Sequence, residues 1–567
     1  MKIYQVSSTV KRAQLFLQAL NKRQILSFAF AILVSGSAFL VIAMKNPIGF
    51  DGAMNLQVAQ NLAQHGKYAR TYDFANGGTP VVAYEEGYRY FPREVETNGA
   101  FTFVATVGFL LFGENQFSYQ FSNLIFIVAL AAVIWWLFRR WLIAAAITPP
   151  LALLSLPETF STSLGGYGEV PGLFFVILSF ALVVRASSMR TRKSALSMLT
   201  LALVAVGLAA NTKVYLVGAL PALLVGAVGL KLVRKDVSVK DLVLRLPYVL
   251  IGPALFEIFK LINIGSLHTY LVWWKLELKD ILQQAGLLKS SHNLPGDNTT
   301  GLVDATLHRL HAFLLIVNDF ILIIILSMVT IALLGFVLYS NKKKFARALR
   351  SPYWSPKVIL ASMLGSMFVI YLTWWAVLLP VTKTFPRRVF PIMLPLELLA
   401  ALLLCVVVSV YFSKHHKLLT KYRSRKPKLF KASKVLVSLL LTCSLVFAIN
   451  ASVSNTQDAL RPGYVTLEQY EQAAEVLKGV VPGHVVYGLD WWSSPTISLM
   501  AGVPIKNVAY INKCELEPER DLILWDRIAS AITKSPEPYS KDVGYKLYKD
   551  LWATQIFKLS SIQSHCD

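Results

Sequence analysis

Asp51 is the first residue of the chain whose type and position suit it to catalysis. It lies in Gly49-Phe-Asp-Gly-Ala-Met, directly after the first long apolar segment. Apolar residues then recur at helical spacing as far as His65-Gly66, which predicts an amphipathic helix on the membrane surface that ends at the glycine. The carboxylate is either a cap for this helix or a general base that removes a proton from a hydroxyl group. Position alone favours the cap.

Glu169 is a second candidate, because it opens a later apolar segment in the sequence Gly-Gly-Tyr-Gly-Glu-Val-Pro. An acid at the start of a helix interacts favourably with the helix dipole, and Pro171 suits a first turn. An acid at a membrane boundary, however, usually has a partner or a function. The sequence leaves both interpretations of Glu169 open.

Three basic residues are candidates for binding an anionic group near these carboxylates. Arg387 and Arg388 lie in Thr-Phe-Pro-Arg-Arg-Val-Phe-Pro, and Lys213 follows Asn-Thr between two apolar segments. A guanidinium group suits phosphate because its planar fork donates two parallel hydrogen bonds. The alternative is that all three are anchors whose charged ends reach the membrane surface.

The composition requires that these residues be positioned by membrane-spanning helices. Of the 567 residues, 55% are hydrophobic and only 16% are charged, and the mean hydropathy is +0.52. A soluble domain carries about 25% charged residues. The chain is therefore not a soluble enzyme, a disordered protein or a secreted disulfide scaffold. We expect a polytopic α-helical membrane protein.

About eleven segments approach the length that spans a bilayer, which is about 20 residues. The predicted spans are 25–44, 117–138, 142–157, 168–185, 195–211, 213–230, 245–264, 312–339, 357–380, 389–411 and 434–452. They make residues 1–452 a membrane module with two large loops, 45–116 and 265–311. The run 101–113 is too short to span and predicts an interfacial or re-entrant helix.

The net charge of +24 follows this topology. More than half of the 56 basic residues, but only two of the 32 acids, lie in six stretches that the span pattern places on one side: 1–24, 139–140, 185–195, 231–245, 341–357 and 413–434. This is the positive-inside bias of a membrane protein, with bases that contact anionic lipid heads. It predicts a cytoplasmic N-terminus and excludes the nucleic-acid partner that the total charge suggests.

Residues 453–567 are predicted to form a small α/β domain outside the membrane, since an odd number of spans separates them from the N-terminus. Thr466-Leu-Glu-Gln469 has the pattern of a capping box at the start of a helix. Cys514 and Cys566 both lie in this domain, and a disulfide between them is about as probable as two free thiols because pairing cannot be read from spacing.

The layout resembles the GT-C glycosyltransferases, which are multispanning enzymes that use polyprenyl-phosphate sugars. The resemblance is carried by Asp51 opening a large first outer loop, the helix after it, the short apolar segment ending in Leu-Phe-Gly113, and the soluble tail. Bacterial relatives of the protein O-mannosyltransferases and the lipid A aminoarabinose transferase are the most similar families. Gly52 stands where the family commonly has a second acid, so one acid remains here.

The resemblance implies a role for each candidate residue. Asp51 would be the general base of an inverting displacement, and Glu169 a second-loop carboxylate that positions the acceptor or a metal. Arg387, Arg388 and Lys213 would bind the donor phosphate. The acceptor would be a hydroxyl of a lipid, glycan or protein at the outer face of a bacterial inner membrane.

Three questions stay open at the sequence level. The cofactor is unknown, because a divalent metal is compatible with the loop acids while no zinc-ligand spacing is present. A secondary transporter or lipid flippase is the alternative function, although the chain lacks the internal repeat such proteins often have. A non-catalytic scaffold for polymer assembly is the third possibility.

Overall fold

The computed structural model of the chain describes most of the membrane module and much of the C-terminal region. The described residues are 21–70, 84–85, 88–90, 99–155, 166, 168–284, 302–316, 355–379, 386–412, 427–461, 466–480, 485–488, 493–503, 505–507, 521–526, 545–550 and 554–559. Cys514 and Cys566 lie outside these ranges, so their pairing stays a prediction.

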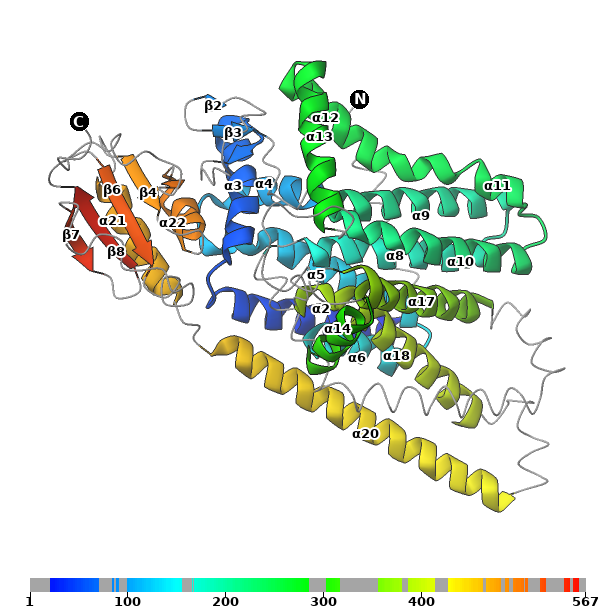
Figure 1. Ribbon diagram of the computed structural model, residues 1–567. Coiled ribbons are helices and arrows are strands. Elements are labelled where there is room, and N and C mark those ends of the chain that lie inside the picture. Colours follow the sequence, from blue (N-terminus) through cyan, green and yellow to red (C-terminus); the bar gives the residue numbers. More distant parts are fainter. Residues whose placement is uncertain are drawn as a thin grey trace.

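Long apolar helices form the body of the molecule (Figure 1). Seven helical segments of the described residues are long and apolar enough to cross a membrane. They include α2 (Lys22–Ala43), α5 (Gln116–Phe138), α8 (Glu169–Ser187), α9 (Arg192–Thr212), α10 (Ala219–Val233), α12 (Ile251–Ile264) and α17 (Ser355–Thr373). The prediction of a polytopic helical membrane protein is thereby confirmed.

The predicted number of about eleven spans stays a prediction. Two of the additional spans correspond to the shorter apolar helices α6 (Leu142–Leu154) and α18 (Phe390–Phe412), and a third lies within α20 (Pro427–Leu460). The predicted span 312–339 lies outside the described residues beyond Ile316, where α14 (Leu302–Ile316) ends. The predicted loop 265–311 contains α13 (Leu267–Gln284).

One large apolar core holds the bundle together, and it joins helices that are distant in sequence. Its buried members come from α2, α5, α8, α9, α10, α17 and α18. Trp135, Phe180 and Trp375 are among the largest side chains that are fully buried. Close packing of this kind stabilises helix association in a membrane, where water supplies little driving force.

The first loop folds into helices and a small sheet against one end of the bundle. It comprises α3 (Phe50–His65), α4 (Ala100–Phe112) and the antiparallel sheet β1-β3-β2, whose strands are Ala69–Arg70, Tyr88–Tyr90 and Tyr84–Glu85. Figure 1 shows α3 lying across the ends of the bundle helices. It ends at Gly66, whose φ of 67° is the left-handed conformation expected of a terminal glycine.

The prediction that α3 is an amphipathic surface helix is wrong. Residues 52–61 are all buried, including the polar side chains Asn55, Gln57, Gln60 and Asn61. These polar groups donate hydrogen bonds within the protein. Gln57 Nε2, for example, lies 3.1 Å from the carbonyl oxygen of Pro495. The helix is enclosed because segments distant in sequence pack on the face that was expected to contact the membrane.

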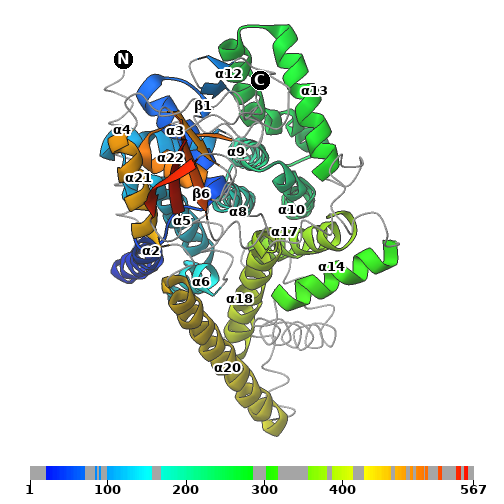
Figure 2. The same ribbon diagram turned by 60° about the vertical axis from the view of Figure 1, so that its left-hand side comes forward.

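The C-terminal region supplies part of this enclosure. Its five-stranded sheet has the order β5-β4-β6-β8-β7, with β5, β4 and β6 parallel and the other pairs antiparallel. The strands are β4 (Val485–Gly488), β5 (Ile505–Asn507), β6 (Asp521–Asp526), β7 (Tyr545–Asp550) and β8 (Thr554–Leu559), and the helices are α21 (Leu467–Val480) and α22 (Ser494–Ala501). The turned view in Figure 2 also places α22 beside α3.

The predicted capping box at the start of α21 is present, since Thr466 and Gln469 exchange reciprocal hydrogen bonds. Separate contacts fix the C-terminal region to the first loop. Thr496 of α22 donates to the carbonyl oxygen of Ile48, which precedes α3, at 3.1 Å. A second apolar core contains residues of α3, α4, α21, α22 and the sheet. The helix that carries Asp51 is therefore held from both sides.

Candidate active site

Asp51 and Arg387 form an ion pair at the end of the bundle covered by α3. Arg387 Nη1 donates to Asp51 Oδ2 over 3.0 Å, and the two side chains are 14% and 24% exposed respectively. Asp51 lies in the first turn of α3, and Arg387 lies in the short 3-10 helix η6 (Pro386–Arg388) just before α18. The N-cap position of α3 is Gly49, which makes no side-chain capping hydrogen bond, so Asp51 is not the N-cap residue.

Glu169 and Lys213 form a second, more deeply buried pair. Lys213 Nζ lies 3.8 Å from Glu169 Oε1, and the two side chains are 3% and 1% exposed. Tyr215 OH donates to the same carboxylate oxygen at 3.2 Å. Glu169 is in the first turn of α8, and Lys213 caps the end of α9. The structure thus places Lys213 beside Glu169, two candidates that the sequence had assigned to different roles.

A glycine-rich turn brings the starts of α3 and α8 together. Gly166 has φ of 63°, and a Cβ atom at this position would lie only 3.1 Å from Cα of Gly52. Asn55 of α3 donates to the carbonyl oxygen of Gly166 at 2.8 Å. Gly168, with φ of 84°, is the N-cap of α8. Only glycine allows this approach and this backbone conformation, and the result is that Asp51 and Glu169 begin neighbouring helices.

Tyr215 lies beside Glu169 and within electrostatic range of Arg387 and Arg388. Its ring is stacked on Trp374, with centroids 5.3 Å apart and planes 11° from parallel, and its carbonyl oxygen accepts from Tyr371 OH at 3.1 Å. Glu169, Arg387 and Arg388 all lie close enough for their charges to act on the Tyr215 hydroxyl group. The two arginines therefore lie within electrostatic range of the Glu169 pair, and Arg388 is 7% exposed.

Tyr215 and Asn55 are site residues that the sequence analysis missed. Tyr215 lies two positions after Lys213 in a 3-10 turn, and Asn55 lies one helical turn after Asp51. In the sequence, only their closeness to Lys213 and Asp51 could have indicated these two residues. Asn55 contacts Gly166, and Tyr215 contacts Glu169 and Trp374, so both depend on partners that are distant in sequence.

Metal binding has no additional support from the described residues. Among them, no group of three or more His, Cys, Asp or Glu side chains is arranged to hold an ion. Two acids of the first loop, Asp73 and Glu94, lie outside the described ranges. The question of a divalent metal therefore stays open.

Comparison with known proteins relates this arrangement to a family. Residues 28–273 match the family model of dolichyl-phosphate-mannose-protein mannosyltransferases. The chain also superposes on ArnT from Cupriavidus metallidurans bound to undecaprenyl phosphate, with a TM-score of 0.52 and 15% identity over 95% of this chain and 99% of that one. The chain has a GT-C fold. The resemblance inferred from the sequence is thereby confirmed.

Two further solved structures show the same likeness of fold. The apo form of the same ArnT gives a TM-score of 0.53 at 14% identity, again over 95% of this chain and 99% of that one. The oligosaccharyltransferase of Archaeoglobus fulgidus, solved with zinc and sulfate, gives 0.50 at 13% identity over 95% of this chain and 74% of that one. No curated protein matches the sequence in a direct search. At these identities the structural likeness establishes the GT-C fold alone.

Proposed function

We propose that this chain is a glycosyltransferase that moves a sugar from a polyprenyl-phosphate carrier to an acceptor hydroxyl group. The observation that carries the proposal is the ion pair between Asp51 and Arg387, which joins a base to a phosphate-binding group at one end of the bundle. The match to a mannosyltransferase family model over residues 28–273 supports it, because that segment contains Asp51, Glu169 and Lys213.

Asp51 and Arg387 together account for the proton and the charge that the reaction moves. The acceptor oxygen attacks the anomeric carbon, its proton passes to the Asp51 carboxylate, and the bond from that carbon to the carrier phosphate breaks with its electron pair on the phosphate. A single displacement of this kind inverts the anomeric centre. Arg387 stabilises the negative charge that develops on the leaving phosphate.

The ion pair also couples donor binding to the strength of the base. A carboxylate held by a guanidinium group is a weaker base than a free one. Arg387 has five N–H donors, and a bound phosphate competes with Asp51 for them. Donor binding then withdraws positive charge from Asp51, so the base becomes strong only when the leaving group is in place.

The buried pair has a supporting role in this proposal. Glu169 is only 1% exposed, so it acts through its neighbours rather than by direct contact with a large substrate. Lys213 and Tyr215 share its Oε1 atom, and the charges of Arg387 and Arg388 reach the Tyr215 hydroxyl group. Glu169 and Lys213 therefore position the arginines, with Arg388 as a second phosphate contact.

The location follows from the same proposal. We place the N-terminus in the cytoplasm and the Asp51 end at the outer face of a bacterial inner membrane, since the basic stretches gather at the opposite ends of the helices. The acceptor is a lipid, glycan or protein that reaches this face.

Transfer by the purified full chain in lipid nanodiscs tests the function. A panel of polyprenyl-phosphate sugars is supplied, and release of polyprenyl phosphate is measured with cell-envelope extract as acceptor. Asp51→Asn should lower the rate by about 10²–10⁴-fold, as expected for a lost general base. Asp458→Asn is the matched control, because Asp458 is 56% exposed and pairs with the neighbouring surface residue Arg461. Equal rates for the parent and Asp51→Asn would contradict the proposal.

A further inference from the structure

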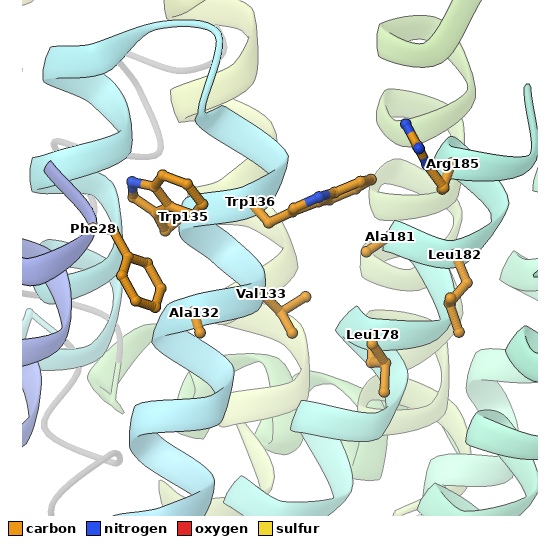
Figure 3. Close-up of a pocket in the computed structure, with 9 residues that line it drawn as sticks. All are labelled: Phe28, Ala132, Val133, Trp135, Trp136, Leu178, Ala181, Leu182 and Arg185. Carbon is orange, nitrogen blue, oxygen red and sulfur yellow. The ribbon is translucent and has the colours of Figure 1, made fainter. Parts of the chain in front are cut away.

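A concave site lies at the opposite end of the bundle from Asp51. It is a cavity of about 420 Å³ between α2, α5 and α8. Figure 3 shows Phe28 of α2 on one side, Val133 and Trp136 of α5 in the centre, and Leu178 of α8 on the other side. Asp51 follows the C-terminal end of α2, whereas Phe28 lies near its N-terminal end. The cavity is therefore separate from the candidate active site.

The cavity is shorter than one membrane leaflet and has a mostly apolar wall. From Leu178 to Arg185, α8 advances about 10 Å at 1.5 Å per residue. One half of a hydrocarbon core is about 15 Å thick. The wall is apolar apart from Arg185. The indole nitrogen of Trp135 donates a hydrogen bond to the hydroxyl group of Ser27 at 3.0 Å, so it is not available to a ligand in the cavity. Phe28, Val133 and Leu178 are half-buried, so the cavity is a groove that opens on the lipid-facing surface.

Three arginines stand at the mouth of this groove. Arg185 is exposed and lines it, and the guanidinium carbon of Arg139 lies 4.5 Å from the ring centroid of Trp136. Arg140 is adjacent in sequence. Burial, together with repulsion from Arg185 and Arg140, lowers the pKa of Arg139 below its ordinary value. Within the described part of the chain, none of the three forms an ion pair with a carboxylate. The mouth is therefore positively charged and would bind an anion favourably.

We propose that this groove binds one anionic phospholipid of the adjacent leaflet. An acyl chain lies along Phe28, Val133 and Leu178, and the phosphate lies between Arg185 and Arg139. An apolar wall that fits within one leaflet, with cations at its mouth, matches an amphiphile with a single anionic head. Free phosphate would use the mouth and leave the apolar wall unoccupied.

The bound lipid would fix the relative positions of α2, α5 and α8. The opposite ends of two of these helices adjoin the candidate active site, because α2 leads into α3, which contains Asp51, and α8 begins at Glu169. The site is nevertheless defined without reference to the sugar-transfer reaction. Its test uses lipid binding alone, so failure of the proposed function would leave the test intact.

Native mass spectrometry of the full chain in detergent, titrated with phosphatidylglycerol, measures the proposed binding. Arg139→Gln together with Arg185→Gln should weaken the adduct by at least about tenfold, since charge-assisted hydrogen bonds are lost. Arg190→Gln is the charge control, because Arg190 is exposed on the same side just after α8. It should bind phosphatidylglycerol like the parent. An equal loss in the control would show general attraction to basic surface and overturn the proposal.

A substitution in the wall separates a lipid from a free anion. Val133→Trp fills the groove and keeps all three arginines, so it should lose the phosphatidylglycerol adduct, while Val133→Ala at the same position should retain it. A melting temperature within a few degrees of the parent identifies folded variants, and Ala132→Trp is the substitute if Val133→Trp is unfolded. Retained binding in a folded, filled variant, or full displacement of the lipid by equimolar inorganic phosphate, would contradict the proposal.

Discussion

Arg387 donates a hydrogen bond to Asp51 across 336 positions of sequence, at 3.0 Å. The pair joins the start of the first-loop helix α3 to the segment that enters α18. A carboxylate and a guanidinium group that are each partly exposed, at 24% and 14%, can exchange partners with a substrate. In the proposed mechanism this exchange would couple binding of the donor phosphate to the strength of the base, and substitutions at Asp51 and at Arg387 test the two roles separately.

Arg387→Ala should weaken binding of the donor. Losing one charge-assisted interaction with phosphate costs roughly 1.5–3 kcal/mol, and Arg387→Lys should restore only part of it because the fork is lost. The measurement is the concentration of polyprenyl-phosphate sugar that gives half-maximal transfer. Arg461→Ala is the control, since Arg461 is 77% exposed and lies near the end of α20. Unchanged donor affinity in an Arg387→Ala, Arg388→Ala double variant would remove both residues from the phosphate site.

Asp51→Glu should also lower the rate of transfer. The additional methylene group moves the carboxylate oxygen by more than catalytic geometry tolerates, and a displacement of about 1 Å can cost about 10²-fold. The helix itself should be unaffected, because Gly49 is its N-cap. The measurement is the single-turnover rate at saturating donor, with circular dichroism as the check on folding. A rate equal to that of the parent would show that Asp51 is not the base.

Glu169 and Lys213 should depend on one another for stability. Removing one member of a buried pair leaves an uncompensated charge and costs about 3–5 kcal/mol. The variants Glu169→Gln and Lys213→Met should therefore each lower the free energy of unfolding, and the double variant should lose less than the sum. Thermal unfolding in detergent measures this cycle. Full additivity would mean that the 3.8 Å contact between them carries no coupling.

Gly166→Ala should impair activity more than a matched glycine substitution. Gly166 and Gly66 have φ of 63° and 67°, so an alanine at either position pays a similar backbone cost of about 1 kcal/mol. A Cβ at Gly166 would lie 3.1 Å from Gly52, whereas nothing lies within 4 Å of one at Gly66. The first variant should separate α3 from α8 and slow transfer. Similar rates in the two variants would show that this close approach is unimportant.

Reporter fusions test the proposed orientation. An enzyme active only outside the cytoplasm should be active when fused after residue 470 and inactive when fused after residue 420. The reason is that the 413–434 stretch is strongly basic and the predicted span 434–452 separates the two points. Activity on the same side for both fusions would contradict the eleven-span topology.

The sequence by itself determined the class of protein and the residues to consider. Apolar length predicts helices reliably because a bilayer demands internal backbone hydrogen bonding, and seven long apolar helices are present among the described residues. Asp51, Glu169 and the three bases were identifiable because each stands at the end of an apolar segment. The GT-C resemblance rested on the order of these features along the chain.

Only the tertiary structure decided which of these residues meet. Sequence spacing has no information on a contact between positions 51 and 387, or on Lys213 lying beside Glu169 rather than with the arginines. It also misjudged α3, because α22 and the adjoining sheet, more than 400 residues further along, cover the face expected to lie on the membrane. Local patterns reflect a residue's neighbours in sequence, whereas burial and charge pairing depend on whichever segments pack against it.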